Sequence, residues 1–487
     1  MTEAEIDPIR LPDIASEDQD LLNRLLAKLA ARQPRNNLRA AFYDGKHAIR
    51  QVGYVIPPQY YRLGIVLGWS AKAVDILARR CNLDGFVWPT GDLDKLGLPD
   101  IIDDNFLHAE VSAALTASLI HGPAFSINTT GAADEPTSLI HFKDALNATG
   151  DWNARTRRMD NLLSITARDG EGKPTGLALY LDGHTITADK DSSGWQVDQT
   201  EHKWGVPVEA LVYKPRIGRP MGSSRISRAV MSLHEQALRT VIRLEGHLDI
   251  YSFPELWMLG ADTSVFKNED GSIKPVWQVM LGRIKGIPDD EDAESDALAR
   301  ADVKQFPAAV PTPHLEALKQ QAQLFSGETS IPLDSLGVTA DRANPTSADA
   351  YLASREDLIA EAEGATDDWS PPLRRTIIRA LAIANEESDI PQDWKSIDTK
   401  WRSPVHLSRA AVADAGSKQL TALPWLADTE VGMELAGLDE QQIKRALAEK
   451  RRGTTTSLVD KLTSTTLPDV PPPSADQTGA APLAQAQ

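Results

Sequence analysis

The sequence has almost no cysteine: Cys81 is the only one in 487 residues. A disulfide within one chain is therefore excluded, and so low a count is typical of proteins that fold in a reducing compartment. Cys81 ends a stretch of apolar residues at helical spacing. We therefore expect it to be a small buried hydrophobic residue and not a catalytic nucleophile.

Positive charge is also in short supply. The 51 lysines and arginines are outnumbered by 69 aspartates and glutamates, which gives a formal net charge of −18. This excess of acid argues against a protein that coats nucleic acid with a basic surface. It leaves open a protein that lets DNA pass through a channel, where weak contact with the wall is an advantage.

Long apolar runs are missing as well. No run reaches the roughly 18 residues that a membrane-spanning helix needs, so we expect no membrane partner. The N-terminal stretch MTEAEIDPIRLPDIASEDQD is acidic and has no apolar centre. We therefore expect no secretory signal and a protein that is made in the cytoplasm.

The sequence carries none of the short motifs that mark common catalytic sites. RRGTTTS at 451–457 lacks the Gly-Lys-Ser/Thr ending of a phosphate-binding loop. The HEQAL stretch that begins at His234 lacks the second histidine of a zinc-protease helix. No Gly-x-Ser-x-Gly element is present. We therefore predict no catalytic residue, no cofactor and no metal site, and we favour a structural protein over an enzyme.

One acidic run, DDEDAESD at 289–296, has two interpretations. It could hold a hard cation, although it lacks the spaced ligands and the turn glycine of a calcium loop. We favour a solvated loop, because so dense a charge is too costly to bury. The residues that head this acidic loop are Asp289, Asp290, Glu291 and Asp292.

The first half of the chain reads as helices followed by strands. Apolar residues recur at helical spacing in 16–32, 70–82 and 105–122, and Ser16 is in position to cap the first of these helices. From 123 to 215, short β-prone runs are separated by Gly, Asp and Lys turns, which is typical of an antiparallel meander. This order predicts an α+β fold.

The second half is mainly helical. A helix over 223–250, with Ser223 or Ser224 as its cap, would be roughly 40 Å long, and a second is predicted over 312–327. The stretch TADRANPTSADAYLASREDLIAEAEG at 339–364 combines a polar loop with a capped amphipathic helix. Helices continue after 370, and the tail from 454 has the composition of a disordered segment.

Seven stretches of the sequence, taken in their order, resemble a known family. They are FYDGKH at 42–47, WSAKAVDILARRCNLDGF at 69–86, NFLHAEVSAALTASLIHGPAFSIN at 105–128, DWNARTRRMDNLLSI at 151–165, GVPVEALVYKPRIGRPMGSSRIS at 205–227, YSFPELWMLG at 251–260 and NPTSADAYLASREDLIAEAEG at 344–364. In this order the chain resembles the portal proteins of tailed double-stranded DNA bacteriophages, in the branch common among siphophages of actinobacteria and other Gram-positive hosts. The resemblance runs from about residue 20 to 450.

The resemblance implies a fold made of wing, stem, clip and crown, and a ring of copies, normally a dodecamer, around a central channel at one vertex of the capsid. It implies that the terminase pumps DNA in through this channel and that the DNA leaves through it into the tail. Further implied partners are the head–tail adaptor, the major capsid protein and the scaffold protein. The protein would be part of the virion and would assemble in the host cytoplasm. The family has no catalytic residues of its own.

The family plan divides this sequence into seven parts. They are the wing at 1–222, a stem helix at 223–250, the clip at 251–311, a returning stem helix at 312–327, the tunnel loop and long wing helix at 328–369, a helical crown at 370–453 and a disordered tail at 454–487. The two stem helices would pack as antiparallel neighbours in the wall of the ring. The acidic loop would belong to the clip.

The family's tunnel loop, which projects into the channel, corresponds to about 333–346 in this sequence. Three apolar residues would pack its base: Leu333, Leu336 and Val338. Three polar residues would lie nearest the DNA: Asp341, Arg342 and Asn344. Without the resemblance, the same stretch reads as a surface loop that precedes an ordinary core helix.

Two other functions remain open on the sequence alone. An enzyme could build its site from scattered residues, which would require a deep pocket with polar groups and perturbed carboxylates. The chain could also be a different structural protein of the capsid, although the order of stem, clip and returning stem argues against this.

Overall fold

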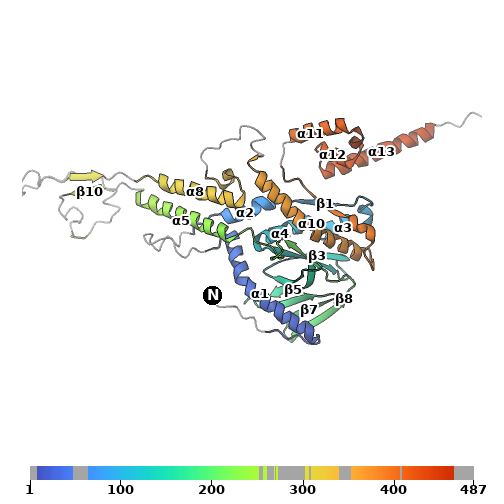
Figure 1. Cartoon of the computed structure of the whole chain (residues 1–487), viewed down its shortest axis with the longest axis horizontal. Coiled ribbons are helices and arrows are strands. Elements are labelled where there is room, and N and C mark those ends of the chain that lie inside the picture. The colour runs from blue at the N-terminus through green and yellow to red at the C-terminus, as the bar shows by residue number, and fades with distance from the viewer. Residues whose placement is uncertain are drawn as a thin grey trace, which may run out of the picture. The chain divides into compact units, whose positions relative to one another are not determined.

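The computed structural model describes residues 8–47, 64–251, 256–259, 268, 270–272, 302–305, 309–338, 353–405 and 409–464 (Figure 1). It divides into two compact units, Met1–Val405 and His406–Gln487, which are considered separately below. Among the described helices, none is both long and apolar enough to cross a membrane.

The first unit contains two antiparallel sheets. The larger has the order β4-β5-β6-β7-β8 and the smaller the order β3-β2-β9. Their strands are β2 (Pro123–Thr130), β3 (Ser138–Asp144), β4 (Ala148–Asn153), β5 (Arg158–Arg168), β6 (Pro174–Tyr180), β7 (His184–Asp191), β8 (Gly194–Glu201) and β9 (Val208–Val212). The meander predicted for 123–215 is therefore confirmed, and so is the α+β class.

The first unit is arranged in layers, because successive side chains along each strand face opposite sides of the sheet. Leu162 of β5 faces the smaller sheet and packs with Phe125 and Val208, whereas the next residue, Leu163, faces a helix on the other side. On the smaller sheet, Ala124 points away from the larger sheet into the main helical core. The order of layers is helix, five-stranded sheet, three-stranded sheet and helices, because each strand side chain points opposite to its neighbour.

The outer helix is α1 (Ser16–Tyr43), which packs its leucine stripe on the larger sheet (Figure 1). The prediction ended this helix at 32, but it continues through Pro34, and Phe42 is buried in the main core. Burial of its last turns outweighs the loss of one backbone donor at the proline. The predicted cap was also wrong, because the N-cap is Ala15 and Ser16 is already helical.

On the other side, the smaller sheet is covered by helices. They are α2 (Trp69–Ala78), α3 (Leu98–Asp104), α4 (Leu107–His121) and α10 (Glu356–Ala384). A short two-stranded sheet, β1 (Leu83–Val87) with β12 (Asp398–Trp401), joins distant parts of the chain beside them. The main core centres on this helical layer, and Trp369 of α10 is its largest fully buried side chain.

Two helices, α5 (Arg228–Tyr251) and α8 (Thr312–Thr329), lie side by side and run antiparallel (Figure 1). Gln321 donates to the hydroxyl of Thr240 at 2.9 Å, and farther along α5 the His247 ring lies 5.1 Å from that of His314. The predicted antiparallel pair is therefore confirmed. The predicted start was five residues early: α5 begins at Arg228, and the Ser227 hydroxyl accepts from the backbone N–H of Val230 at 3.1 Å. Ser223 and Ser224 do not cap the helix.

Within 251–311, the described residues include a two-stranded ladder. β10 (Leu256–Leu259) pairs antiparallel with β11 (Asp302–Gln305). The β-prone character expected near 256 is confirmed there. The acidic loop residues Asp289, Asp290, Glu291 and Asp292 lie outside the described residues.

The boundary predicted between 369 and 370 falls inside a helix. α10 continues through Pro371 and Pro372 to Ala384. The Pro-Pro pair removes two backbone donors, but the residues that follow are buried against the smaller sheet, and that burial keeps the helix continuous. Two arginines fix it there: Arg375 and Arg379 bind the buried carboxylate of Glu209 on β9, at 2.8 and 2.9 Å.

The second unit is helical. It contains α11 (Arg409–Ala422), α12 (Glu430–Leu435) and α13 (Glu440–Ser464). The disordered tail was predicted from 454, but α13 extends to Ser464. Extending a helix that has already formed requires no new nucleation step. The weak helix formers after 453 can therefore be helical because the residues before them already are. Residues 465–487 lie outside the described residues.

Candidate functional site

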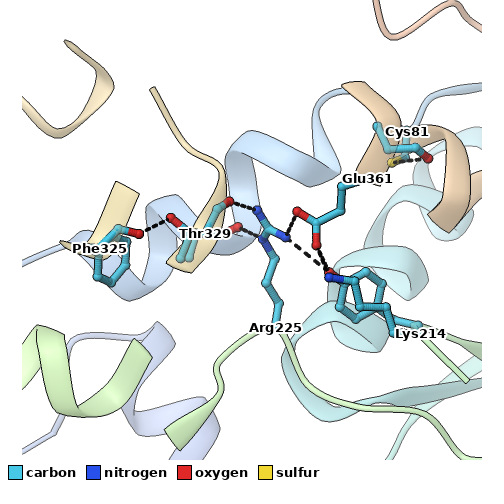
Figure 2. A network of polar contacts seen from close by, with 9 residues as sticks. Cys81, Lys214, Arg225, Phe325, Thr329 and Glu361 are labelled. Carbon is cyan, nitrogen blue, oxygen red and sulfur yellow. Dashed lines mark hydrogen bonds and ion pairs between the residues drawn. The ribbon is translucent and has the colours of Figure 1, made fainter. Parts of the chain in front are cut away.

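The strongest concentration of buried polar contacts lies where the two antiparallel helices meet the main core (Figure 2). It is centred on Arg225, in the segment between β9 and α5. We call this group the junction and define it by five residues: Tyr213, Lys214, Arg225, Thr329 and Glu361. Its members come from the residues just after β9, the segment before α5, the end of α8 and the second turn of α10.

Arg225 connects four segments of the chain through one side chain. Its guanidinium donates to the carbonyl of Ala73 on α2, to the carbonyl of Thr329 at 2.7 Å and to the hydroxyl of Tyr213 at 3.1 Å. It also forms an ion pair with Glu361, with Nη1 and Oε2 2.5 Å apart. The Arg225 side chain is only 4 % exposed. Its planar set of donors is well suited to holding several acceptors at fixed angles.

Glu361 is satisfied on both oxygens. Oε2 pairs with Arg225, and Oε1 accepts from the Tyr213 hydroxyl at 2.6 Å and from Lys214. Burial works to raise the pKa of Glu361, but Arg225, Lys214 and Tyr213 together outweigh burial and hold the pKa below its usual range. The carboxylate is therefore charged at neutral pH. Burial is also the main reason that the pKa of Tyr213 is raised, so its hydroxyl remains a donor.

The single thiol of the chain lies beside the junction. Cys81 is 3 % exposed, and its Sγ lies 3.8 Å from the carbonyl oxygen of Ala362. Burial raises the pKa of Cys81 to about 12, so the thiol is protonated at neutral pH. A protonated, buried thiol is a poor nucleophile. The prediction that Cys81 is a buried hydrophobic residue is confirmed.

The segment proposed as the tunnel loop begins next to the junction. Leu336 is buried, and Leu333 and Val338 pack partly buried against the main core, so the burial predicted for these three residues is confirmed. The remaining predicted residues, Asp341, Arg342 and Asn344, lie outside the described residues.

Side-chain contacts tie the two ends of 339–352 together. Arg355, just before α10, pairs with Asp334 at 3.1 Å, and Lys72 of α2 donates to the carbonyl of Ser335 at 2.7 Å. These contacts span the intervening segment, since Asp334 precedes it and Arg355 follows it. Whatever conformation 339–352 adopts, its ends are held near α2 and the start of α10.

Nothing in the junction is arranged like a catalytic site. Each charged group is paired with an opposite charge or with carbonyl oxygens. Among the described residues, no group of three or more His, Cys, Asp and Glu side chains could hold a metal ion. The geometry is that of a structural contact, in which a buried ion pair and its hydrogen bonds fix the relative positions of α2, α5, α8 and α10.

Sequence reasoning missed the junction. Arg225 is a single arginine in a Ser-rich segment, and Glu361 is one of several acids on an amphipathic helix. The only local signal is that Glu361 directly precedes Ala362, an apolar residue of the amphipathic helix predicted within 339–364. A carboxylate at the edge of an apolar stripe indicates partial burial, but it does not identify the partner.

The chain is similar to known proteins over most of its length. The family model described as phage portal protein, SPP1 Gp6-like, matches residues 22–455. The portal protein of Mycobacterium phage L5 is 25 % identical over 397 residues, which cover 78 % of this chain and 77 % of the relative. The portal protein of Mycobacterium phage D29 is 24 % identical over 401 residues, which cover 78 % of each.

Solved structures with a similar chain include two neck assemblies of gene transfer agent (GTA) particles. The neck of the empty particle, computed with C6 symmetry, has a TM-score of 0.43 at 14 % identity, over 80 % of this chain and 92 % of that chain. The neck of the native particle, computed with C12 symmetry, has a TM-score of 0.39 at 12 % identity, over 76 % and 90 %.

We expect Glu361→Gln to lower the unfolding free energy at pH 7 by about 3–5 kcal/mol, because it leaves the Arg225 guanidinium buried without its counter-charge. The stability that depends on the Glu361 charge is fully present above the ordinary carboxyl pKa of about 4.3. It is lost as the pH falls through the pKa of Glu361 in the folded protein, which is lower. The difference in unfolding free energy between the wild type and Glu361→Gln should therefore become smaller as the pH is lowered. Thermal unfolding followed by circular dichroism from pH 7 to pH 3 measures it.

The matched control is Glu171→Gln, which removes an exposed carboxylate that pairs with Lys173. We expect this change to stay within about 0.5 kcal/mol of the wild type. An unfolding midpoint of Glu361→Gln equal to that of Glu171→Gln at pH 7 would show that the junction does not stabilise the fold.

Proposed function

The chain belongs to the phage portal protein family of the SPP1 Gp6-like type, and from this membership we propose how it works as a portal protein. Copies of the chain form a ring, a dodecamer in the family plan, at one vertex of the capsid. DNA enters through the ring during packaging by the terminase and leaves through it into the tail. The single observation that carries this proposal is the family match over residues 22–455.

The pair of helices α5 and α8 supplies the wall of the channel in this proposal. The inner half of the pair is buried against the main core through residues such as Val230, Ala237 and Phe325. The pair and the residues just before α8 nevertheless leave large apolar side chains exposed: Leu248, Tyr251, Val310, Leu315 and Leu324. Exposed apolar side chains that gather on one feature are typical of an interaction surface. A neighbouring copy in a ring would cover them.

The excess of acid suits a channel that must not hold its DNA. Each contact between a lysine or arginine and a phosphate adds affinity that resists movement. A chain with a net charge of −18 keeps such contacts few. Arg342 would be an isolated positive charge on the tunnel loop, beside Asp341 and Asn344.

The junction and its neighbours would fix the position of the residues that flank the proposed tunnel loop. Arg225 links the start of α5 to the end of α8 and to α10, and Asp334 and Arg355 hold the two ends of 339–352. We assign the clip to 251–311, where the ladder of β10 and β11 would meet neighbouring copies, the terminase or the head–tail adaptor. The acidic loop at 289–292 would lie on that surface. The major capsid and scaffold proteins would surround the ring in the virion, after assembly in the host cytoplasm.

We expect Leu324→Asp to weaken ring formation while the monomer remains folded. Leu324 is 56 % exposed on α8, so a charge there costs little in a single chain but disrupts an apolar contact with a neighbour. Size-exclusion chromatography with light scattering, done in the presence of scaffold and capsid proteins, would detect the loss of large oligomers. The control is Ile390→Asp, a similarly exposed aliphatic position in the loop after α10. Rings that form equally well with Leu324→Asp would argue against the proposed contact.

We expect Arg342→Ala to leave ring assembly intact and to change the amount of DNA that is packaged or retained. The change removes the one positive charge among the three residues proposed to face the DNA. Packaging yield and DNA retention in assembled particles are the measurements, with Arg155→Ala, an exposed arginine on the turn after β4, as the control. Unchanged packaging and retention for Arg342→Ala would remove this role from the loop.

A further inference from the structure

A second polar feature lies where α1 and the end of α4 meet strands β2 and β4, and it differs in character from the junction. A pocket of about 130 Å³ is lined by residues of α1, the end of α4, β2, β4 and the segment before α5. Four arginines contribute to its walls: Arg32, Arg35, Arg39 and Arg219. We call it the arginine pocket. It is unexpected in a chain whose net charge is −18.

The arginines of this pocket lack counter-charges. Among the described residues, the guanidinium groups of Arg32, Arg35 and Arg219 make no hydrogen bond or ion pair, and Arg39 donates to the carbonyl of His121 at 2.8 Å. Burial and the neighbouring arginines lower the pKa of Arg39 to about 10, and they also lower the pKa of Arg35. The four groups thus repel one another. A bound anion would relieve this repulsion.

Two carboxylates lie near the lining residues, and both have other partners. Asp144 influences the pKa of His121, and its Oδ1 accepts from the side-chain amide of Asn147 at 3.0 Å. Asp151 lies close enough to Arg32 to affect its pKa, but its oxygens bind Arg24 at 2.8 Å and Lys28 at 2.7 Å. It therefore does not neutralise the pocket. The positive charge of the walls remains available to a ligand.

The buried part of the pocket adds polar atoms that have no partner. Asn36 Oδ1, His121 Nδ1 and Thr149 Oγ1 make no hydrogen bond within the described part of the chain, although all three residues are more than nine-tenths buried. Buried polar atoms are nearly always hydrogen-bonded, so three in one pocket need an explanation. Burial lowers the pKa of His121 to about 4, so its ring is neutral at pH 7 and can donate from one nitrogen.

The orientation of Asn36 indicates what kind of group fits. Its Nδ2 donates to the carbonyl of Ala145 at 2.9 Å, which leaves Oδ1 as an acceptor that needs a donor. A carboxylate and a phosphodiester bring only acceptors, whereas hydrogen phosphate and the singly protonated form of a phosphate monoester bring acceptor oxygens and one O–H. Thr149 and His121 can donate to the oxygens, and guanidinium groups bind such oxygens in pairs.

The size of the pocket suits a single phosphate group. Sites that enclose drug-sized molecules and cofactors occupy roughly 300–1,000 Å³, so about 130 Å³ would enclose a phosphate group but not a whole nucleotide. We propose that the arginine pocket binds one compact oxyanion of the phosphate type, either inorganic phosphate or the terminal phosphate of a monoester. This proposal does not depend on ring assembly, because every lining residue belongs to the first unit of one chain.

Titration calorimetry of the full chain with inorganic phosphate, at pH 7.5 and constant ionic strength, tests the proposal. We expect saturable binding of one phosphate per chain. Arg35→Ala combined with Arg219→Ala should weaken it at least about tenfold, because two charge-assisted contacts are lost. Both side chains are exposed at the mouth of the pocket, so the fold should survive. The matched control combines Arg155→Ala with Lys173→Ala and removes two exposed charges elsewhere.

A second variant distinguishes specific binding in the pocket from non-specific attraction of anions to the arginines. Thr149→Val keeps every arginine and removes one buried hydroxyl, so we expect phosphate affinity to fall severalfold while the unfolding midpoint holds or rises. Acetate and a short DNA duplex without terminal phosphates serve as carboxylate and phosphodiester probes, and a phosphate monoester distinguishes the two phosphate sources. Tight binding of the monoester but not of inorganic phosphate would assign the site to monoesters.

Three results would overturn the proposal. The first is the absence of saturable binding by either phosphate probe to the wild type. The second is equal affinity in the wild type, the double arginine variant and Thr149→Val. The third is binding of acetate or duplex DNA as tight as that of phosphate with the same dependence on Arg35 and Arg219, since that would make the pocket a site for another class of anion.

Discussion

The buried ion pair between Arg225 and Glu361 is the interaction on which the rest of the first unit depends. Two charges removed from water are stable only when every remaining donor and acceptor is used, and here the Arg225 donors reach Ala73, Tyr213 and Thr329 as well as Glu361. The pair therefore constrains geometry more strictly than an apolar contact would. If α5, α8 or α10 shifted, at least one buried group would lose its partner.

This constraint holds several elements of the first unit at one point. The ends of 339–352 and the starting points of both antiparallel helices are attached to the same buried network or to its immediate neighbours. A displacement of the helices would therefore be transmitted to the base of the loop instead of being absorbed between them.

Periodicity predicted much of the fold but little of the site. The alternation that separates Leu162 from Leu163 is visible in the sequence, and it correctly places strands throughout 123–215. The continuation of α10 through Pro371 was not visible, because local signals favour a helix start there and only burial against the smaller sheet overrides them. The junction joins residues far apart in the chain, and no local pattern pairs them. Arg32, Arg35 and Arg39 do share one helical face by spacing, yet the unpartnered atoms beside them are a product of tertiary packing.

In the proposed ring, α5, α8 and the junction divide the stability of the protein between one chain and its neighbours. Arg225 finds all its partners within a single copy, so the base of the stem is complete in the monomer. Farther out, Leu248 and Tyr251 of α5 remain exposed, and a pair of helices alone offers no third surface to bury them. In the proposed ring a neighbouring copy would bury these residues, and the stability of this end of α5 would then depend on protein concentration. A ring built in this way would order its channel wall as it closes, while the loop base and the sheets are formed beforehand.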